Sequence, residues 1–191
     1  MPEENPLGER GRALEDDYFR KRDRELLDKM RQASAAEAAR RELSEKSGLQ
    51  DPEMLQELQA LGFTPETVAL LPLVPLVQMA WAEGGVSDAE RKLILQLART
   101  RGIEEGSAAD RQLADWLSSR PEQQVFSSAA RLIRATLESG AASVVPVTAD
   151  DLVKYCEQIA AASGGMFGIH RISSEERALL STIARDLGHK G

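Results

Sequence analysis

The chain has 191 residues and a mass of 20.9 kDa, a length that predicts one domain with at most a short extension. Hydrophobic residues make up 42% of it and aromatic residues only 4%, which favours an aliphatic core carried on helices. The net charge of −7 argues against nucleic acid as a partner, because phosphate binding needs a positive surface. The single cysteine, Cys156, excludes an intramolecular disulfide and any two-cysteine zinc or redox motif.

The N-terminal residues 1–5 are polar and acidic and lack the features of a secretory signal, so we expect a cytoplasmic protein. The longest apolar run, residues 68–82, is shorter than a bilayer span and contains Pro72, Pro75 and Gln78. We therefore expect no transmembrane segment and interpret the run as a buried helix. Peripheral association with a membrane stays open.

Residues 8–46 form a densely charged block with 11 Lys and Arg against 10 Asp and Glu. Helix-forming residues dominate, and the block predicts one long, mostly exposed helix with a narrow, irregular apolar stripe. The stripe does not follow a regular heptad repeat, which gives little support for a coiled coil. We divide the chain into a charged N-terminal helical extension, 1–47, and an all-helical domain, 48–191. Residues 8–46 are the expected site of a protein partner or of self-association.

The rest of the chain predicts a series of short helices that begin at capping residues or proline and end near glycine. No segment alternates apolar and polar residues for long enough to predict a strand. The fold class is therefore all-α, a compact helical bundle. The expected helices cover residues 52–61, 65–70, 73–83, 88–101, 107–119, 121–139, 149–163 and 174–187.

Two segments of the domain resemble each other. Residues 86–102 match residues 172–188 at 7 of 17 positions, and residues 78–85 match 158–165 at a Gln, two Ala and two Gly. The second copy carries an insertion, residues 166–171. This pattern predicts a helical hairpin used twice, packed so that each copy covers the apolar face of the other.

An acidic turn in the first copy is the candidate metal site. Glu83, Asp88 and Glu90 flank two glycines, and carboxylate oxygens are the ligands that calcium and magnesium prefer. The alternative is structural, because Ser87 and Glu90 form the pattern of a capping box at the start of a helix. Residues 173–176 repeat that pattern, and capping would explain Asp88 and Glu90 without an ion.

Three other features are weaker candidates for a functional site. The glycine-rich segment 163–170 could cradle a phosphate, but it lacks both the preceding strand and the lysine of a P-loop. Cys156 could act as a nucleophile only with a partner such as His170 nearby, and a buried structural thiol is the more usual role. Trp81 and Trp116 are interpreted as packing residues of the core. We therefore expect no enzymatic activity.

Residues 70–91 resemble the signature of the TerB-like (tellurite-resistance TerB) family, Ala-Asp-Gly-x-Val-Ser-x-x-Glu in a helical hairpin. Glu83 replaces the aspartate of the signature, and in the second copy Ser163 stands at that position. The resemblance implies a cytoplasmic, bacterial helical bundle linked to stress responses and membrane-linked metal sensing, with no established enzymatic activity. Any metal role would fall to Glu83 and Glu90. The matching residues are Ala82, Gly84, Val86, Ser87 and Glu90.

Two hypotheses follow from these patterns. In the first, a non-enzymatic TerB-like module binds a divalent cation, calcium or magnesium, at the acidic turn and passes that state to a partner. In the second, the chain is a ligand-free interaction or scaffold protein that docks through residues 8–46, and the Gly-Gly turns are only tight turns.

Overall fold

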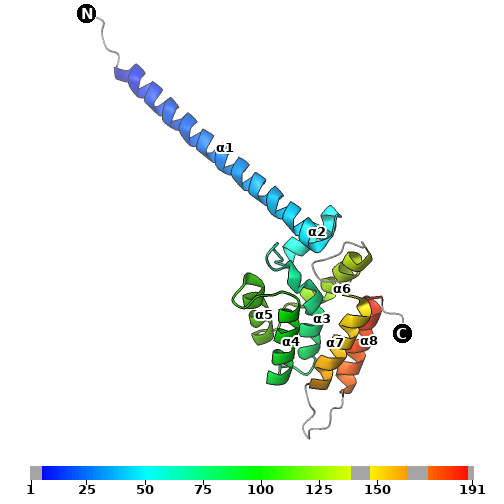
Figure 1. Ribbon diagram of the computed structural model, residues 1–191. Coiled ribbons are helices and arrows are strands. Elements are labelled where there is room, and N and C mark those ends of the chain that lie inside the picture. The colour runs from blue at the N-terminus through cyan, green and yellow to red at the C-terminus, as the bar shows by residue number, and fades with distance from the viewer. Residues whose placement is uncertain (1–5, 139–146, 163–171, 189–191) are drawn as a thin grey trace, which may run out of the picture. The chain divides into compact units, whose positions relative to one another are not determined.

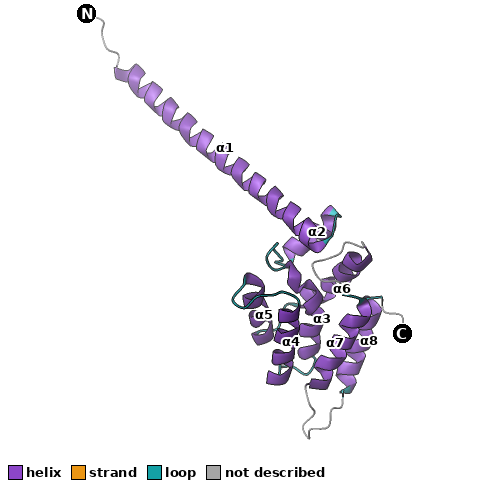
Figure 2. Cartoon of the chain, in the orientation of Figure 1, coloured by secondary structure: helices purple, strands orange, loops and turns teal. Residues whose placement is uncertain are grey.

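The computed structural model describes residues 6–138, 147–162 and 172–188, with side chains from Tyr18 onward, and this part of the chain forms helices and turns without a strand (Figure 2). The all-α prediction is confirmed. The chain divides into two compact units, Met1–Arg41 and Glu42–Gly191. In chain order the elements are α1 (Pro6–Ser47), α2 (Pro52–Ala60), the 3-10 helix η1 (Val68–Leu73), α3 (Val74–Ala80), α4 (Asp88–Thr100), α5 (Ala108–Ser118), α6 (Gln123–Glu138), α7 (Ala149–Ala162) and α8 (Ser174–Asp186).

The long helix α1 was expected to be exposed, and the structure confirms this for the side chains from Tyr18 to Ala38. Charged residues of both signs lie along it, and Arg31 pairs with Asp28 at 3.5 Å. Exposed pairs of this kind contribute a few tenths of a kcal/mol. The helix therefore depends on its own propensity and backbone hydrogen bonds over this stretch.

The last turn of α1 belongs to the second unit, whereas the sequence placed the domain boundary after residue 47. Leu43 is fully buried in the core of that unit, and Ser47 is buried beside it. The Ser47 hydroxyl accepts a hydrogen bond from the backbone N–H of Leu49 at 3.2 Å. Gly48, with φ of 75°, supplies the left-handed residue that ends the helix. The boundary between the units thus falls inside a continuous helix.

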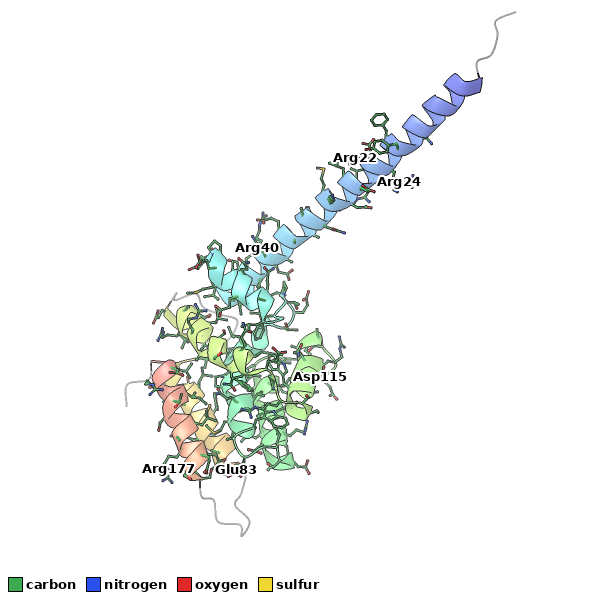
Figure 3. The ribbon with its side chains drawn as sticks, turned by 180° about the vertical axis from the view of Figure 1, so that it is seen from behind. Arg22, Arg24, Arg40, Glu83, Asp115 and Arg177 are labelled. Atoms are coloured by element: carbon green, nitrogen blue, oxygen red, sulfur yellow. The ribbon has the colours of Figure 1, made fainter. Side chains whose placement is uncertain are left out.

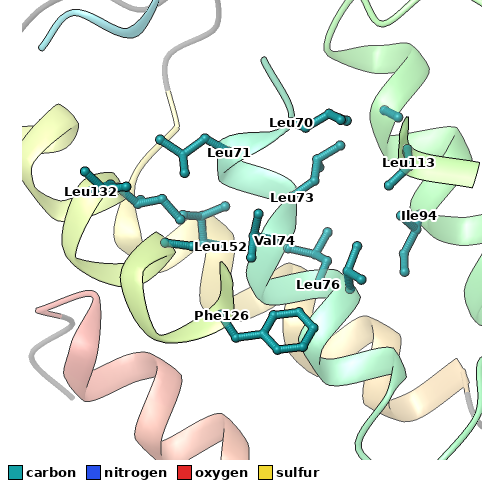
Figure 4. Close-up of a cluster of buried hydrophobic side chains, with 14 of the residues drawn as sticks. Leu70, Leu71, Leu73, Val74, Leu76, Ile94, Leu113, Phe126, Leu132 and Leu152 are labelled. Carbon is teal, nitrogen blue, oxygen red and sulfur yellow. The ribbon is translucent and has the colours of Figure 1, made fainter. Parts of the chain in front are cut away.

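The core of the second unit is built around η1 and α3. All but one of the residues of α3 are buried, which confirms the interpretation of the apolar run as a buried helix. The helix contacts η1, α4, α6, α7 and α8 (Figure 1). Figure 4 shows the apolar cluster at this centre, formed by Leu70, Leu71, Leu73, Val74, Leu76, Ile94, Leu113, Phe126, Leu132 and Leu152.

The expected helix over residues 65–70 is wrong in its position and its type. The chain instead makes a turn, in which the N–H of Thr67 donates to the carbonyl of Thr64 at 3.0 Å, and then a 3-10 helix from Val68. Pro72 lies inside that helix and has no N–H to give to the carbonyl of Val68, so an α-helical ladder would be incomplete here. The chain therefore forms a short 3-10 helix at this point in place of an α-helix. The other expected helices are confirmed to within a few residues at each end.

Two tryptophans fix α5 against the core. The indole N–H of Trp81 donates to the carbonyl oxygen of Trp116 at 2.9 Å. Trp116 in turn makes an edge-to-face contact with Phe63, with ring centroids 5.8 Å apart. Both tryptophans are partly buried against the core, which confirms their expected role as packing residues.

The internal repeat is visible in helices α4 and α8. Each begins at a serine capping box, at Ser87 and Ser173. Each is followed by a glycine in the left-handed region, Gly102 with φ of 77° and Gly188 with φ of 76°. Helix α7 contacts α3, α4 and α8, so the two hairpins pack on each other as the repeat predicts.

Candidate functional site

The acidic turn links α3 to α4. Helix α3 ends at Ala80 with Trp81 as its C-cap, and the N–H of Gly84 donates to the Trp81 carbonyl at 3.2 Å. Gly84 has φ of 87°, a conformation that a residue with a side chain adopts only under strain. The chain thereby reverses direction within a few residues and leaves a depression open to solvent. It is lined by Glu83, Gly84, Gly85, Val86, Ser87 and Glu90.

Glu90 closes the capping box at the start of α4. Its Oε2 accepts hydrogen bonds from both the N–H and the hydroxyl of Ser87, each at 2.7 Å. The Ser87 hydroxyl oxygen accepts the N–H of Glu90 at 3.3 Å. These contacts satisfy backbone donors that a helix leaves unpaired at its first turn. The capping interpretation of Glu90 is confirmed.

The second copy of the hairpin repeats this geometry at the start of α8. The N–H of Ser173 donates to Oε2 of Glu176 at 2.8 Å, and the N–H of Glu176 donates to the Ser173 hydroxyl oxygen at 3.1 Å. Glu90 is 3% exposed and Glu176 is 1% exposed. Two buried carboxylates therefore occupy equivalent positions in the two hairpins.

The surroundings of Glu90 raise the pKa of its carboxyl above the ordinary value of 4.5. Burial is the largest cause, because it disfavours the charged form. The hydrogen bonds from Ser87 lower the pKa and partly offset burial, while the negative charges of Glu176 and Glu83 raise it further. The carboxyl of Glu90 therefore interacts with an acidic residue from each of the two hairpins.

The three residues that the sequence proposed as metal ligands differ in their surroundings. Glu83 and Asp88 are exposed, while Glu90 is buried and its carboxylate accepts hydrogen bonds from Ser87. Among the described residues, no group of three or more His, Cys, Asp or Glu side chains is arranged to hold a metal ion. Figure 3 labels Glu83 at the same end of the bundle as Arg177 of α8.

The remaining sequence candidates contribute little to this site. The glycine-rich segment 163–170, with His170, lies outside the described residues. Cys156 is fully buried on α7, and burial raises the pKa of its thiol to about 12. A thiol in that state is protonated at neutral pH and is a poor nucleophile, which agrees with its expected structural role.

A second candidate site lies on α1, where large apolar side chains face solvent. Tyr18, Phe19, Leu26, Leu27 and Met30 are between 51% and 63% exposed, and we refer to these five residues as the α1 apolar face. The rings of the first two meet edge to face at 5.9 Å. From its charge and helical pattern, the block 8–46 was expected to hold a protein partner or a second copy. It did not indicate which side chains would be left uncovered, because that depends on tertiary packing.

Helix geometry gathers these side chains on one half of α1. At about 100° per residue, Phe19, Leu26 and Met30 point within about 40° of one another. Tyr18 and Leu27 flank this line, one on each side. Arg22 and Arg24 lie on the same stretch of α1 (Figure 3). The charged residues 20–25 separate Tyr18 and Phe19 from Leu26, Leu27 and Met30, so the face consists of two apolar groups with charged side chains between them. Exposed apolar side chains gathered on one side of a helix are typical of an interaction site.

Comparisons with known proteins identify no relative. No family model matches the chain, and no curated protein or solved structure is similar to it. Within the described ranges, no helix has the length and apolar character needed to cross a bilayer. The site must therefore be interpreted from its own residues.

Proposed function

We propose that this protein is a non-enzymatic interaction protein that docks to a protein partner, or to another copy of itself, through the α1 apolar face. The observation that carries the proposal is the exposure of five large apolar side chains within residues 18–30 of a single helix. Apolar surface gains about 25 cal/mol for each Å² removed from water, so covering this face with a partner is favourable.

The composition of the segment supports docking of a helix into a partner. The apolar line of Phe19, Leu26 and Met30 provides the anchors, since large apolar side chains dominate the energetics of helix recognition. Charged residues of both signs lie between and beside these anchors, and they supply orientation more than affinity. Helix α1 extends the anchors over about three helical turns.

Site-specific photo-crosslinking in cells that express the full chain tests this function. A photoreactive amino acid replaces Leu26, and the control places the same amino acid at Ala35, which is exposed on the opposite side of α1. We expect a discrete covalent adduct from position 26 and none from position 35. Equal or absent adducts at the two positions would refute docking through this face.

Cation binding at the α3–α4 turn is a second candidate function, as the TerB-like resemblance implies. The observation in its favour is that the charges of Glu83 and Glu176 both act on the carboxyl of Glu90. A divalent cation at the turn would relieve this repulsion, and calcium or magnesium would take oxygen ligands there.

Calorimetric titration of the chelator-treated full chain with calcium and magnesium tests this candidate. The variant Glu83→Gln removes the exposed carboxylate of the turn, and Asp115→Asn is the matched control because it neutralises an exposed carboxylate on α5. Cation binding predicts heat that is lost in Glu83→Gln and kept in Asp115→Asn. If neither ion gives a heat of binding, cation binding at the turn is refuted, and Glu83 and Glu90 act only as turn and capping residues.

A further inference from the structure

We propose that the buried last turn of α1 nucleates the rest of this helix, so that the folding of the second unit controls the helical order of residues 18–41. The claim concerns the conformation of α1 and holds whatever molecule covers the α1 apolar face. Only its consequence for docking rests on the proposed function. The observations that carry it are the anchoring of the last turn, the composition of the adjoining segment and the exposure of the remainder.

The last turn of α1 is fixed by the core of the second unit. Leu43 is 0% exposed and Leu49 is 3% exposed, and both belong to that core. The N–H of Gly48 donates to the carbonyl of Ser44 at 2.9 Å, and the Ser44 hydroxyl donates to the carbonyl of Leu49 at 2.6 Å. When the second unit folds, the backbone of this turn is therefore already held in its helical form.

A turn that is already fixed removes the largest cost of making a helix. The first turn of an isolated helix is unfavourable by about a factor of a thousand, because several residues lose backbone freedom for a single hydrogen bond. Each further residue then adds with an equilibrium constant of about one. The exposed part of α1 can therefore grow from the anchored turn toward the N-terminus without a second nucleation step.

The segment next to the anchored turn is suited to that growth. Five of the seven residues 33–39 are alanine, which is the strongest helix former. The side chains of residues 33–38 are exposed, so packing in a core does not explain this composition. No glycine, proline or β-branched residue lies anywhere in residues 18–47. The alanine-rich segment therefore connects the anchored turn to the α1 apolar face without a position that breaks the helix.

The interactions along the exposed part give the helix little support of their own. The side chains of residues 18–38 are exposed. The ion pair between Arg31 and Asp28 joins side chains that are 78% and 65% exposed, and such pairs stabilise a helix only slightly. Residues 18–31 carry six basic against three acidic side chains, so repulsion between like charges opposes the helix here. The anchored turn therefore has a large share in keeping this part helical.

This arrangement couples the α1 apolar face to the fold of the second unit. A partner that recognises residues 18–30 as a helix binds the full chain more tightly than it binds the same segment without its anchor, since less conformational entropy is lost on binding. By thermodynamic reciprocity, such a partner also stabilises the last turn of α1 against local opening. The face is thus presented as a docking helix chiefly while the second unit is folded.

Cα chemical shifts of the full chain, measured by NMR, test the inference because they report helical content at each residue. Ala36→Pro interrupts the helix between the anchored turn and the α1 apolar face. The matched control Ala13→Pro makes the same break on the N-terminal side of that face. We expect Ala36→Pro to lower the helical shift over residues 18–32 by about half or more, while Ala13→Pro leaves it largely unchanged.

Two results would overturn the inference: equal losses over residues 18–32 in the two variants, or no loss in Ala36→Pro. The fluorescence of Trp81 and Trp116, which both lie in the second unit, verifies that this unit stays folded in each variant. Ala36 is exposed, so its replacement removes no contact of the core.

Photo-crosslinking from position 26 in cells then separates this inference from the docking function. If the native chain gives an adduct, Ala36→Pro should reduce it and Ala13→Pro should keep it. Equal adducts in all three chains would leave docking in place and overturn its dependence on the anchored helix. If no chain gives an adduct while NMR shows a loss only in Ala36→Pro, the docking function fails and nucleation by the last turn stands.

Discussion

Glu90 and Glu176 hold equivalent positions in the two hairpins, and the charge of Glu176 raises the pKa of Glu90. Each carboxylate closes a capping box, and each is almost fully buried. The duplicated hairpin therefore brings its two capping acids close enough to interact. This arrangement makes the start of α4 the part of the bundle whose stability we expect to depend most on the ionisation of one carboxyl.

The pH dependence of stability is the first prediction. Because folding raises the pKa of Glu90, its contribution to the free energy of unfolding is fully present below the ordinary value of 4.5 and is lost as pH rises through the folded-state pKa. Glutamine keeps the side-chain carbonyl that accepts from Ser87 and does not ionise. Chemical denaturation should therefore show Glu90→Gln gaining stability relative to the native chain between pH 4 and pH 7.

Glu66 provides a control of opposite sign. Its exposed carboxylate accepts the Thr64 hydroxyl at 2.6 Å, and this hydrogen bond lowers the pKa of Glu66. Its contribution is present above the ordinary pKa and is lost as pH falls, so Glu66→Gln should lose stability relative to the native chain between pH 4 and pH 7. The same trend in both variants would contradict the account of Glu90.

The conformation of the α3–α4 turn gives a second prediction. Gly84→Ala forces a side chain into the left-handed region, although a Cβ there would meet no neighbouring atom within 4 Å. The expected loss is about 1 kcal/mol of unfolding free energy, from backbone strain alone. Gly85→Ala, at a position without positive φ, is the control and should lose much less.

The difference between the core and the α1 apolar face gives a third prediction. Leu76 is fully buried in α3, and Leu76→Ala should reduce the free energy of unfolding by about 2–5 kcal/mol. Leu26→Ala removes the same atoms from a side chain that is 53% exposed, and the loss should stay within about 0.5 kcal/mol when the protein is dilute. A large loss for Leu26→Ala in dilute solution would place that leucine in the core of the fold.

The reactivity of the single cysteine gives a fourth prediction. Cys156 is buried and its thiol has a pKa of about 12, so a thiol reagent should label it only when the bundle opens. Labelling under native conditions should be slow and should accelerate with added denaturant. Rapid labelling of the native chain at neutral pH would contradict the burial of α7.

Much of the fold follows from the sequence for local reasons. Serine capping boxes and prolines set the starts of the helices, and glycines such as Gly102 set their ends. The burial of α3 follows from its apolar residues, which Gln78 alone interrupts. The 3-10 helix at Val68–Leu73 was missed because Pro72 changes the hydrogen-bond pattern without changing the apolar pattern.

The candidate sites depend on contacts that one sequence does not reveal. The capping pattern predicted the hydrogen bonds of Glu90, but its burial and the approach of Glu176 arise from the packing of two hairpins. In the same way, the irregular stripe on α1 predicted an exposed helix. The exposure of Phe19 and Leu27 depends on tertiary packing, which the sequence pattern does not give.

Amide hydrogen exchange along α1 tests the central claim most directly, because it reports whether the α1 apolar face is covered in the full chain. The account predicts that exchange over residues 18–31 is slower in an extract of cells that express the chain than in the dilute purified chain, and that Leu26→Glu abolishes the slowing while Ala35→Glu does not. Exchange that is equally fast in both conditions, with or without Leu26→Glu, would contradict docking through this face.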